Sequence, residues 1–187
     1  GRARPPDDLD DIGAASEPEG FIGVVYADGN NMGTLLEELR TPADYQEFAR
    51  AVHRATIDAT FTALATCLGP HRYQEKTRRL HPFEVLSIGG DDVFLIVPAQ
   101  AALPIAVTIA QEAETRLSGL AITREAKEYQ WERVHRIPLP EGQGVKPQSK
   151  VSLSSGVVIA DHHTPVFFLR RLVEELLKSA KAKAKGL

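Results

Sequence analysis

The stretch FEVLSIGGDDVFLIV, residues 83–97, consists of two apolar runs separated only by GGDD at residues 89–92. Both runs are rich in β-branched and aromatic residues, which indicates strands. So short a connection forces the strands into an antiparallel hairpin, because the glycines supply the backbone angles that a tight turn requires. Taken alone, GGDD is a good turn sequence and needs no other role.

A second stretch, FIGVVYADGNNMG at residues 21–33, supplies a strand that can pair with this hairpin. Its first part is apolar and β-branched, as in a strand buried on both faces, and the run ends at Asp28. A short helix is expected over residues 32–39. Taken alone, the polar segment after the strand is typical of a loop that caps a helix.

Helical patterns fill the spaces between the strands. One helix begins at Thr41-Pro42, where a capping residue precedes a proline, and Gly69-Pro70 ends it. The remaining elements are a helix over 100–119, a strand over 150–160 and a last helix entered through Thr164-Pro165. The order is therefore β-α-β-β-α-β plus a C-terminal helix. This order predicts an α+β, ferredoxin-like fold, an antiparallel sheet with helices on one face.

The chain has 187 residues and fits one domain, which we place at 21–187 with an insertion around 122–149. Residues 1–20 carry two arginines, six acidic residues and three prolines, and we expect them to form an acidic flexible linker. The first residue is Gly rather than Met, so the chain is expected to be a piece of a longer protein.

The overall composition narrows the class of protein. With 43% hydrophobic residues the chain can bury a core, and a net charge of −3 does not favour a charge-driven nucleic-acid binder. Cys67 is the single cysteine, so neither an intrachain disulfide nor a cysteine zinc cluster can form. No apolar run approaches the roughly 18 residues that span a membrane. We therefore expect a cytoplasmic protein with no membrane partner.

The predicted topology brings Asp28 within a few ångströms of Asp91 and Asp92. Together with the backbone carbonyl of Gly29, these carboxylates are the hard oxygen ligands that Mg²⁺ or Mn²⁺ prefers. Two such ions can activate an attacking hydroxyl and stabilise the leaving oxygens of a displacement at phosphorus. Grouped carboxylates repel one another without a cation, and a purely structural turn has no reason to accept that cost. The two stretches together therefore favour a two-ion metal site for nucleotide chemistry.

A nucleotide at this site would meet the neighbouring loops and the last helix. The glycines of the hairpin have no Cβ and let a base or phosphate approach the backbone. Three lysines at i, i+3 and i+7 form one stripe on the last helix, where a solvated helix end is the alternative. The expected nucleotide-binding residues are Gly29, Asn30, Asn31, Ser87, Gly89, Gly90, Lys178, Lys181 and Lys185.

Two further segments allow more than one interpretation. Ser152, Ser154 and Gly156 give the strand over 150–160 a small-residue face, which either leaves room for a flat ligand such as a base or is packed closely by another segment. The segment ADHHT at 160–164 is expected to be a surface loop, because no second Asp-rich box accompanies it.

Three separated blocks resemble the palm domain of the large subunit of type III CRISPR effector complexes. They are YADGNNMG at 26–33, FEVLSIGGDDVFLIVPA at 83–99 and the pair VSLSSGVVIA and LLKSAKAKAK within 151–185. The resemblance covers 21–185 and is weakest over 122–149. It implies a palm fold, as in diguanylate cyclases, and synthesis of 3′-5′ linked cyclic oligoadenylates from ATP, second messengers in antiviral defence.

The same resemblance implies roles for individual residues. Asp28 and Asp91 would be the principal metal ligands, Asp92 a further ligand, and Lys181 and Lys185 the residues that hold the triphosphate. Two ATP molecules must meet, so a second palm is expected as partner, in another copy or in the full-length chain, along with CRISPR ribonucleoprotein subunits.

Alternatives remain open at this point. The hairpin reads GGDDV and not the GGDEF or GGEEF of diguanylate cyclases, which argues against cyclic di-GMP as the product. A minimal stand-alone enzyme that makes a cyclic dinucleotide is one alternative. A catalytically inactive palm that binds nucleotide, or acts as a scaffold in a ribonucleoprotein, is the other. The sequence does not set the base specificity or the ring size.

Overall fold

A computed structural model describes residues 3–30, 32–72, 79–118, 120 and 151–184. The expected insertion at 122–149, Asn31 and Lys185 lie outside these residues. The elements are α1 (Leu9–Ala14), β1 (Phe21–Gly29), α2 (Met32–Glu37), α3 (Pro42–Cys67), β2 (His71–Arg72), β3 (Arg79–Leu80), β4 (Glu84–Gly89), β5 (Asp92–Pro98), η1 (Ala99–Ala101), α4 (Ala102–Leu117), β6 (Leu153–Asp161) and α7 (Val166–Ala184).

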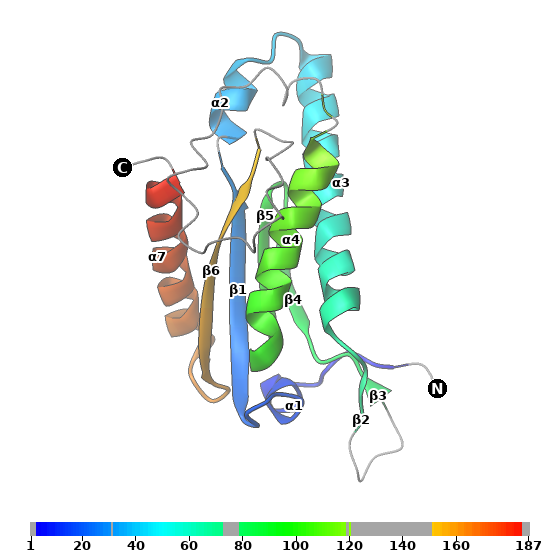
Figure 1. Cartoon of the computed structure of the whole chain (residues 1–187), viewed down its shortest axis with the longest axis vertical. Helices are drawn as coiled ribbons and strands as arrows, with labels where there is room; N and C mark the ends of the chain where they lie inside the picture. The colour runs from blue at the N-terminus through cyan, green and yellow to red at the C-terminus, as the bar shows by residue number, and fades with distance from the viewer. Residues whose placement is uncertain (1–2, 31, 73–78, 119, 121–150, 185–187) are drawn as a thin grey trace, which may run out of the picture.

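The main sheet has four antiparallel strands in the order β4-β5-β1-β6 (Figure 1). The first strand of the chain is thus central, between the hairpin strand β5 and the last strand β6. The registers pair Tyr26 with Phe94 and Asp28 with Ser154. This is the predicted ferredoxin-like arrangement, and the predicted α+β fold class is confirmed.

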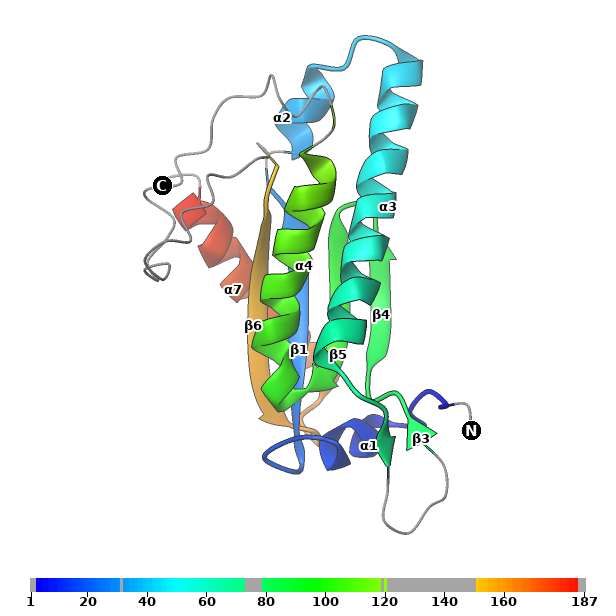
Figure 2. The same ribbon diagram turned by 45° about the vertical axis from the view of Figure 1, so that its right-hand side comes forward.

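Helices cover both faces of this sheet. Figure 2 shows α3 and α4 in front of the sheet, where they pack against Val25, Ala27 and Leu95. On the opposite face α1 and α7 pack against Ile22 and Val24. The expectation of helices on one face therefore holds for the β-α-β-β-α-β unit and not for α1 and α7. The reason lies in β1, which is apolar on both faces and needs cover on both.

The N-terminal residues differ from the expected flexible linker. Residues Leu9–Ala14 form α1, Asp8 caps this helix through Asp11, and the side chain of Ile12 is fully buried against the sheet. Ser16 links the helix end to the core by accepting a hydrogen bond from the backbone of Ala99 at 3.2 Å. Three of the acidic residues that suggested a linker, Asp8, Asp10 and Asp11, lie at the helix N-terminus, where the helix dipole favours negative charge.

The predicted start of α3 is confirmed in detail. The hydroxyl of Thr41 accepts a hydrogen bond from the backbone N–H of Asp44, and the carboxylate of Asp44 accepts one from the backbone N–H of Thr41, a reciprocal capping box. Phe48 and Val52 are buried, whereas Tyr45 is half exposed because the first turns of α3 extend past the end of the sheet (Figure 1). In the described part of the chain, no helix combines the length and apolar character needed to cross a membrane.

Candidate functional site

The end of β1 and the β4–β5 turn meet at one edge of the sheet. Asp28 is the last acidic residue of β1, and Asp91 and Asp92 lie at the turn, where Gly90 has a φ of +62° that favours glycine. A Cβ on Gly29 would lie 2.6 Å from a carboxylate oxygen of Asp91. The topology therefore brings Asp28 beside Asp91, whose close approach Gly29 permits, and places Asp92 near enough for its carboxylate to feel the charge of Asp28.

Lys181 reaches this cluster from α7, on the face of the sheet opposite α3 and α4. Its Nζ donates hydrogen bonds to the carboxylate of Asp28 and, at 2.9 Å, to the carbonyl oxygen of Gly29. The lysine side chain is only 24% exposed, so its charge is directed inward. Lys178, three residues earlier, is exposed and lines no described hollow near the cluster.

Burial and the charge of Asp28 raise the pKa values of the two hairpin carboxylates. Burial, followed by the negative charge of Asp28, raises the pKa of Asp91, while the ammonium of Lys181 lowers it. The pKa of Asp92 is raised by the same two causes. Each shift means that the charged form is held unfavourably in the fold. The cluster has more negative charge than one lysine balances and is thus suited to bind a cation.

Asn30, the residue after the end of β1, is bound by the protein itself. Its side chain is 3% exposed and hydrogen-bonds to β6 and the residue before it: Nδ2 donates to Ser152 at 3.1 Å and Oδ1 accepts from Ser154 at 3.0 Å. The backbone of Asn30 also donates to the carbonyl of Ser152 at 2.8 Å. The residue therefore positions the loop after Asp28, and its amide is occupied by protein contacts.

An open hollow of about 330 Å³ surrounds the cluster. Most of its walls come from the β1–α2 loop and the start of α2, with the hairpin and α7 closing the sides. Its charged lining residues are two carboxylates and one ammonium, so the hollow favours a cation. The lining residues are Asp28, Gly29, Asn30, Met32, Gly33, Thr34, Asp91 and Lys181.

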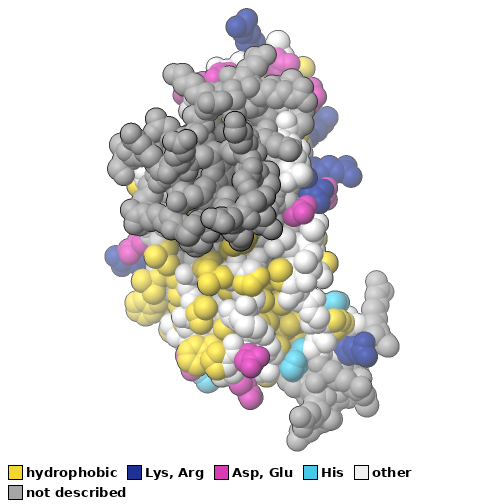
Figure 3. All heavy atoms as spheres, viewed as in Figure 1, with side chains coloured by type: hydrophobic (Ala, Val, Ile, Leu, Met, Phe, Trp, Pro, Cys, Tyr) yellow, Lys and Arg dark blue, Asp and Glu magenta, His cyan; other side chains and the backbone are white. Residues whose placement is uncertain are grey.

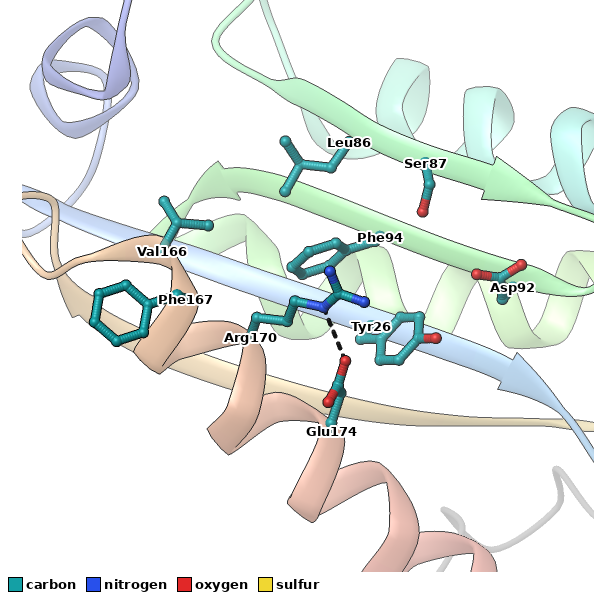
Figure 4. A pocket seen from close by; sticks show the side chains of 9 residues that line it. All are labelled: Tyr26, Leu86, Ser87, Asp92, Phe94, Val166, Phe167, Arg170 and Glu174. Carbon is teal, nitrogen blue, oxygen red and sulfur yellow. Dashed lines mark hydrogen bonds and ion pairs between the residues drawn. The ribbon is translucent and has the colours of Figure 1, made fainter.

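A second hollow of about 520 Å³ lies beside Asp92, between β4 and the first turns of α7 (Figure 4). In the view, Arg170 extends from α7 toward Tyr26 and Phe94 on the sheet, and it donates to Glu174 at 2.9 Å. Burial and the charge of Asp92 raise the pKa of the Tyr26 hydroxyl. The predicted Ser87 lines this second hollow and not the acidic one. Gly89 leaves room for the carboxylate of Asp92, because a Cβ on Gly89 would lie 3.0 Å from its Oδ1.

The sequence contained signals for residues that were not predicted. Tyr26 lies two residues before Asp28, and side chains two apart in a strand share a face. Arg170 and Glu174 precede Lys181 by eleven and seven residues, spacings that return to one face of a helix. The two-residue period of a strand and the 3.6-residue period of a helix therefore indicate that these side chains share faces with Asp28 and Lys181.

The small-residue face of β6 is packed by protein. A Cβ on Gly156 would collide with the carbonyl of Val173 and lie 3.0 Å from the backbone nitrogen of Leu177. Of the two interpretations of this face, close packing is the one observed, and the packing segment is α7. At Gly156 no room remains for a base, and this contact sets the position from which Lys181 reaches the acidic cluster.

Comparisons with known proteins identify the family. The model of the Cas10/Cmr2 second palm domain matches residues 21–186. None of the curated proteins matches the chain.

Solved Csm1 structures have a similar fold. Csm1 from T. onnurineus has 16% identity and a TM-score of 0.63, and the match covers 97% of this chain and 23% of that one. The Csm1-Csm4 cassette with AMPPNP has 17% identity and a TM-score of 0.61, and the match covers 94% of this chain and 21% of that one. The same cassette with cA4 has 17% identity and a TM-score of 0.60, with the same coverage. The chain spans about a fifth of the length of these Csm1 chains. On the match to 21–186, the chain belongs to the Cas10/Cmr2 second palm domain family.

Proposed function

We propose that this palm is a nucleotidyltransferase that joins ATP molecules by 3′-5′ linkages into cyclic oligoadenylates. The observation that supports this most is the acidic group at one edge of the sheet: Asp28, Asp91 and Lys181 line one polar hollow, and the charge of Asp28 also acts on Asp92. Family membership adds support, because Csm1-Csm4 cassettes of the same fold have been solved with AMPPNP and with cA4.

The donor set of the acidic cluster fits Mg²⁺ or Mn²⁺. Asp28, Asp91 and Asp92 offer carboxylate oxygens and Gly29 a carbonyl oxygen, all of them ligands that these ions prefer. The raised pKa values of Asp91 and Asp92 are consistent with a site that lacks positive charge. The chemistry that two ions contribute when bound is neutralisation of charge on the reacting phosphates.

The residues of the chain then have separate tasks. Lys181 pairs with Asp28 and has its ammonium inside the hollow, where it can also hold a triphosphate. Gly89 and Gly90 keep the hairpin free of side chains that would obstruct the nucleotide. In the reaction, the 3′-hydroxyl oxygen of one ATP bonds to the α-phosphorus of another. The bond to the β-phosphate breaks, pyrophosphate leaves, and the hydroxyl proton passes to solvent.

Two ATP molecules must face each other, so the proposal includes a second palm as partner. Around the second hollow the surface carries exposed apolar side chains, which are unusual on a solvated face and suit a protein partner. Phe167 is 66% exposed and Leu86 42% exposed. The partner is a second copy or another palm of a longer chain, with CRISPR ribonucleoprotein subunits further out.

Product analysis tests the proposal. The purified chain is incubated with Mg²⁺ or Mn²⁺ and each of the four nucleoside triphosphates, and products are resolved by mass spectrometry. We expect oligoadenylates from ATP, absent in the Asp91→Ala, Asp92→Ala variant. A linear or cyclic dinucleotide as sole product would favour the minimal-enzyme alternative. Metal-dependent ATP binding without any product would favour the inactive nucleotide-binding palm, and no binding at all would favour the scaffold.

A further inference from the structure

A cluster of metal-ligating side chains lies at the end of the molecule opposite the acidic site. Its members are Asp10 on α1 and His162 and His163 in the turn between β6 and α7. One ligand atom from each lies within 4.8 Å of the others. This is the lower end of the molecule in Figure 1, where Figure 3 shows histidine and acidic side chains. Along β1, about 25 Å separate the two ends, given roughly 3.3 Å per strand residue.

The ring of His162 is fixed in an orientation that suits metal binding. Its backbone nitrogen donates to the carbonyl of Gly20 at 3.0 Å, and its Nδ1 lies 2.7 Å from the same oxygen. The ring packs against Gly13 of α1, where a Cβ would lie 3.2 Å from the imidazole. An Nδ1–H that donates to a carbonyl leaves the lone pair of Nε2 free for a metal, the arrangement found around metal-ligating histidines.

His163 has the same type of support from a carboxylate. Its Nδ1 lies 2.9 Å from Oδ1 of Asp161, which also accepts the backbone N–H of His163 at 2.9 Å. An Nδ1–H that donates to Asp161 leaves the lone pair of Nε2 free on this ring too, oriented by a carboxylate as in carboxylate–histidine–zinc groups. The ring centroids of the two histidines are 3.9 Å apart. The side chain of His163 is 76% exposed, so it can adjust to an ion without disturbing the core.

The distance between the ligand atoms of His162 and Asp10 suits two atoms that bind the same ion. Nε2 of His162 lies 3.3 Å from Oδ1 of Asp10. Zinc bonds of about 2.0–2.1 Å at tetrahedral angles put neighbouring ligands about 3.3 Å apart. A direct charge-assisted hydrogen bond would be shorter, about 2.7–2.9 Å. The pair is thus spaced for an ion between its atoms.

We propose that Asp10, His162 and His163 bind one Zn²⁺ ion, with a fourth position open to water or to a ligand from a partner. Two imidazoles and one carboxylate suit zinc among the abundant divalent ions, whereas Mg²⁺ prefers oxygen ligands alone. The ion ties α1 to the β6–α7 turn and so fixes the N-terminal helix on the palm. The sequence alone predicts only a surface loop at 160–164, because the third ligand lies about 150 residues away in the chain.

Zinc titration of the untagged, chelator-treated chain tests the proposal, with a chromophoric chelator as competitor. We expect one Zn²⁺ per chain and a rise in Tm of roughly 5–10 °C at a hundredfold excess over Kd. His163→Ala and Asp10→Asn, both at exposed side chains, should weaken binding at least tenfold. His53→Ala, at an exposed position on α3, is the matched control and should bind as the native chain does.

The acidic cluster is a second place where a divalent ion can bind, and the Asp91→Ala, Asp92→Ala variant separates the two. Zinc binding that persists in that variant and disappears in His163→Ala assigns the ion to the histidine cluster. Co²⁺ absorption in the visible range should show nitrogen ligation that the His163→Ala chain lacks. Equal zinc affinity in the native and His163→Ala chains, or no stoichiometric binding at micromolar zinc, would overturn the proposal and leave the nucleotide site unaffected.

Discussion

At the residue scale, Lys181 connects the fold to the proposed chemistry. Among the described residues that line the acidic hollow it is the only cation, and it already balances the charge of Asp28. In water such a pair would be worth little, but both side chains are mostly buried here, which strengthens the interaction. The same ammonium lies where a triphosphate would enter.

Replacing Lys181 with methionine tests this role while keeping most of the side-chain volume. We expect ATP affinity to fall about 10–100-fold, since a hydrogen bond to a charged group is worth about 1.5–3 kcal/mol. Lys178→Met, on the exposed side of the same helix, is the control and should bind ATP almost unchanged. Calorimetric titration with ATP and Mg²⁺ measures both variants, and equal losses in the two would mean that only the net charge of the helix matters.

Much of the site was predictable from residue positions. The carboxylates follow from strand ends and turn residues, and Lys181 follows from helix periodicity. The role of Asn30 was not, because its partner Ser152 is 122 residues away and only the folded sheet brings them together. Ser87, which we predicted to bind nucleotide, lines the second hollow together with Asp92 and does not line the acidic one.

At the element scale, the position of α7 on the sheet decides whether Lys181 reaches the acidic cluster. Helix α7 approaches β6 so closely at Gly156 that a Cβ would meet the backbone of Val173 and Leu177. The contact is backbone against backbone, so no side chain can move aside. The register of this contact therefore sets where the end of α7 lies.

The Gly156→Ala variant should push α7 away from the sheet. We expect it to lower the free energy of unfolding by about 1–3 kcal/mol, typical of overpacking, and to weaken ATP binding as Lys181 is displaced. Gly69→Ala is the control, because a Cβ there would meet open space. Chemical denaturation measures the stability. A variant as stable as the native chain, with unchanged ATP affinity, would contradict this view of the α7 contact.

The type of an element, helix or strand, was predictable where its hydrophobic pattern extends over many residues. The strands of the sheet and helices α3, α4 and α7 follow from runs of many residues. Helix α1 was missed because Ile12 and Leu9 are too few apolar residues to establish a period among six acidic ones. The face that α7 covers was also not predictable from its own pattern, since it depends on the close approach at Gly156.

At the scale of the whole molecule, the pH dependence of folding contains one unusual contribution. Burial raises the pKa of Glu114 on α4 from 4.5 to about 7, and its Oε1 has no hydrogen-bond partner among the described residues. Between these pH values the folded chain holds a proton that the unfolded chain has lost. Stability therefore falls as the pH rises from 4.5 to about 7, and the loss is complete above that range.

The Glu114→Gln variant removes this titration. Above pH 7 we expect it to be more stable than the native chain by about 1–2 kcal/mol, a value reduced for the partial exposure of the carboxyl group. Near pH 4.5 the two chains should differ little. Thermal unfolding across this range measures the effect, with the exposed Glu47→Gln as control. A gain that is the same at both pH values would contradict the assignment to Glu114.

Calorimetric titration of ATP with and without Mg²⁺ tests most directly whether the three carboxylates form a cation-dependent ATP site. We predict that the native chain binds ATP only with the cation and that the Asp91→Ala, Asp92→Ala variant loses this binding. The same variant should remain folded, and without the cation its Tm should equal or exceed the native value because carboxylate repulsion is relieved. ATP binding that is equal in the two chains, or independent of the cation, would contradict the account.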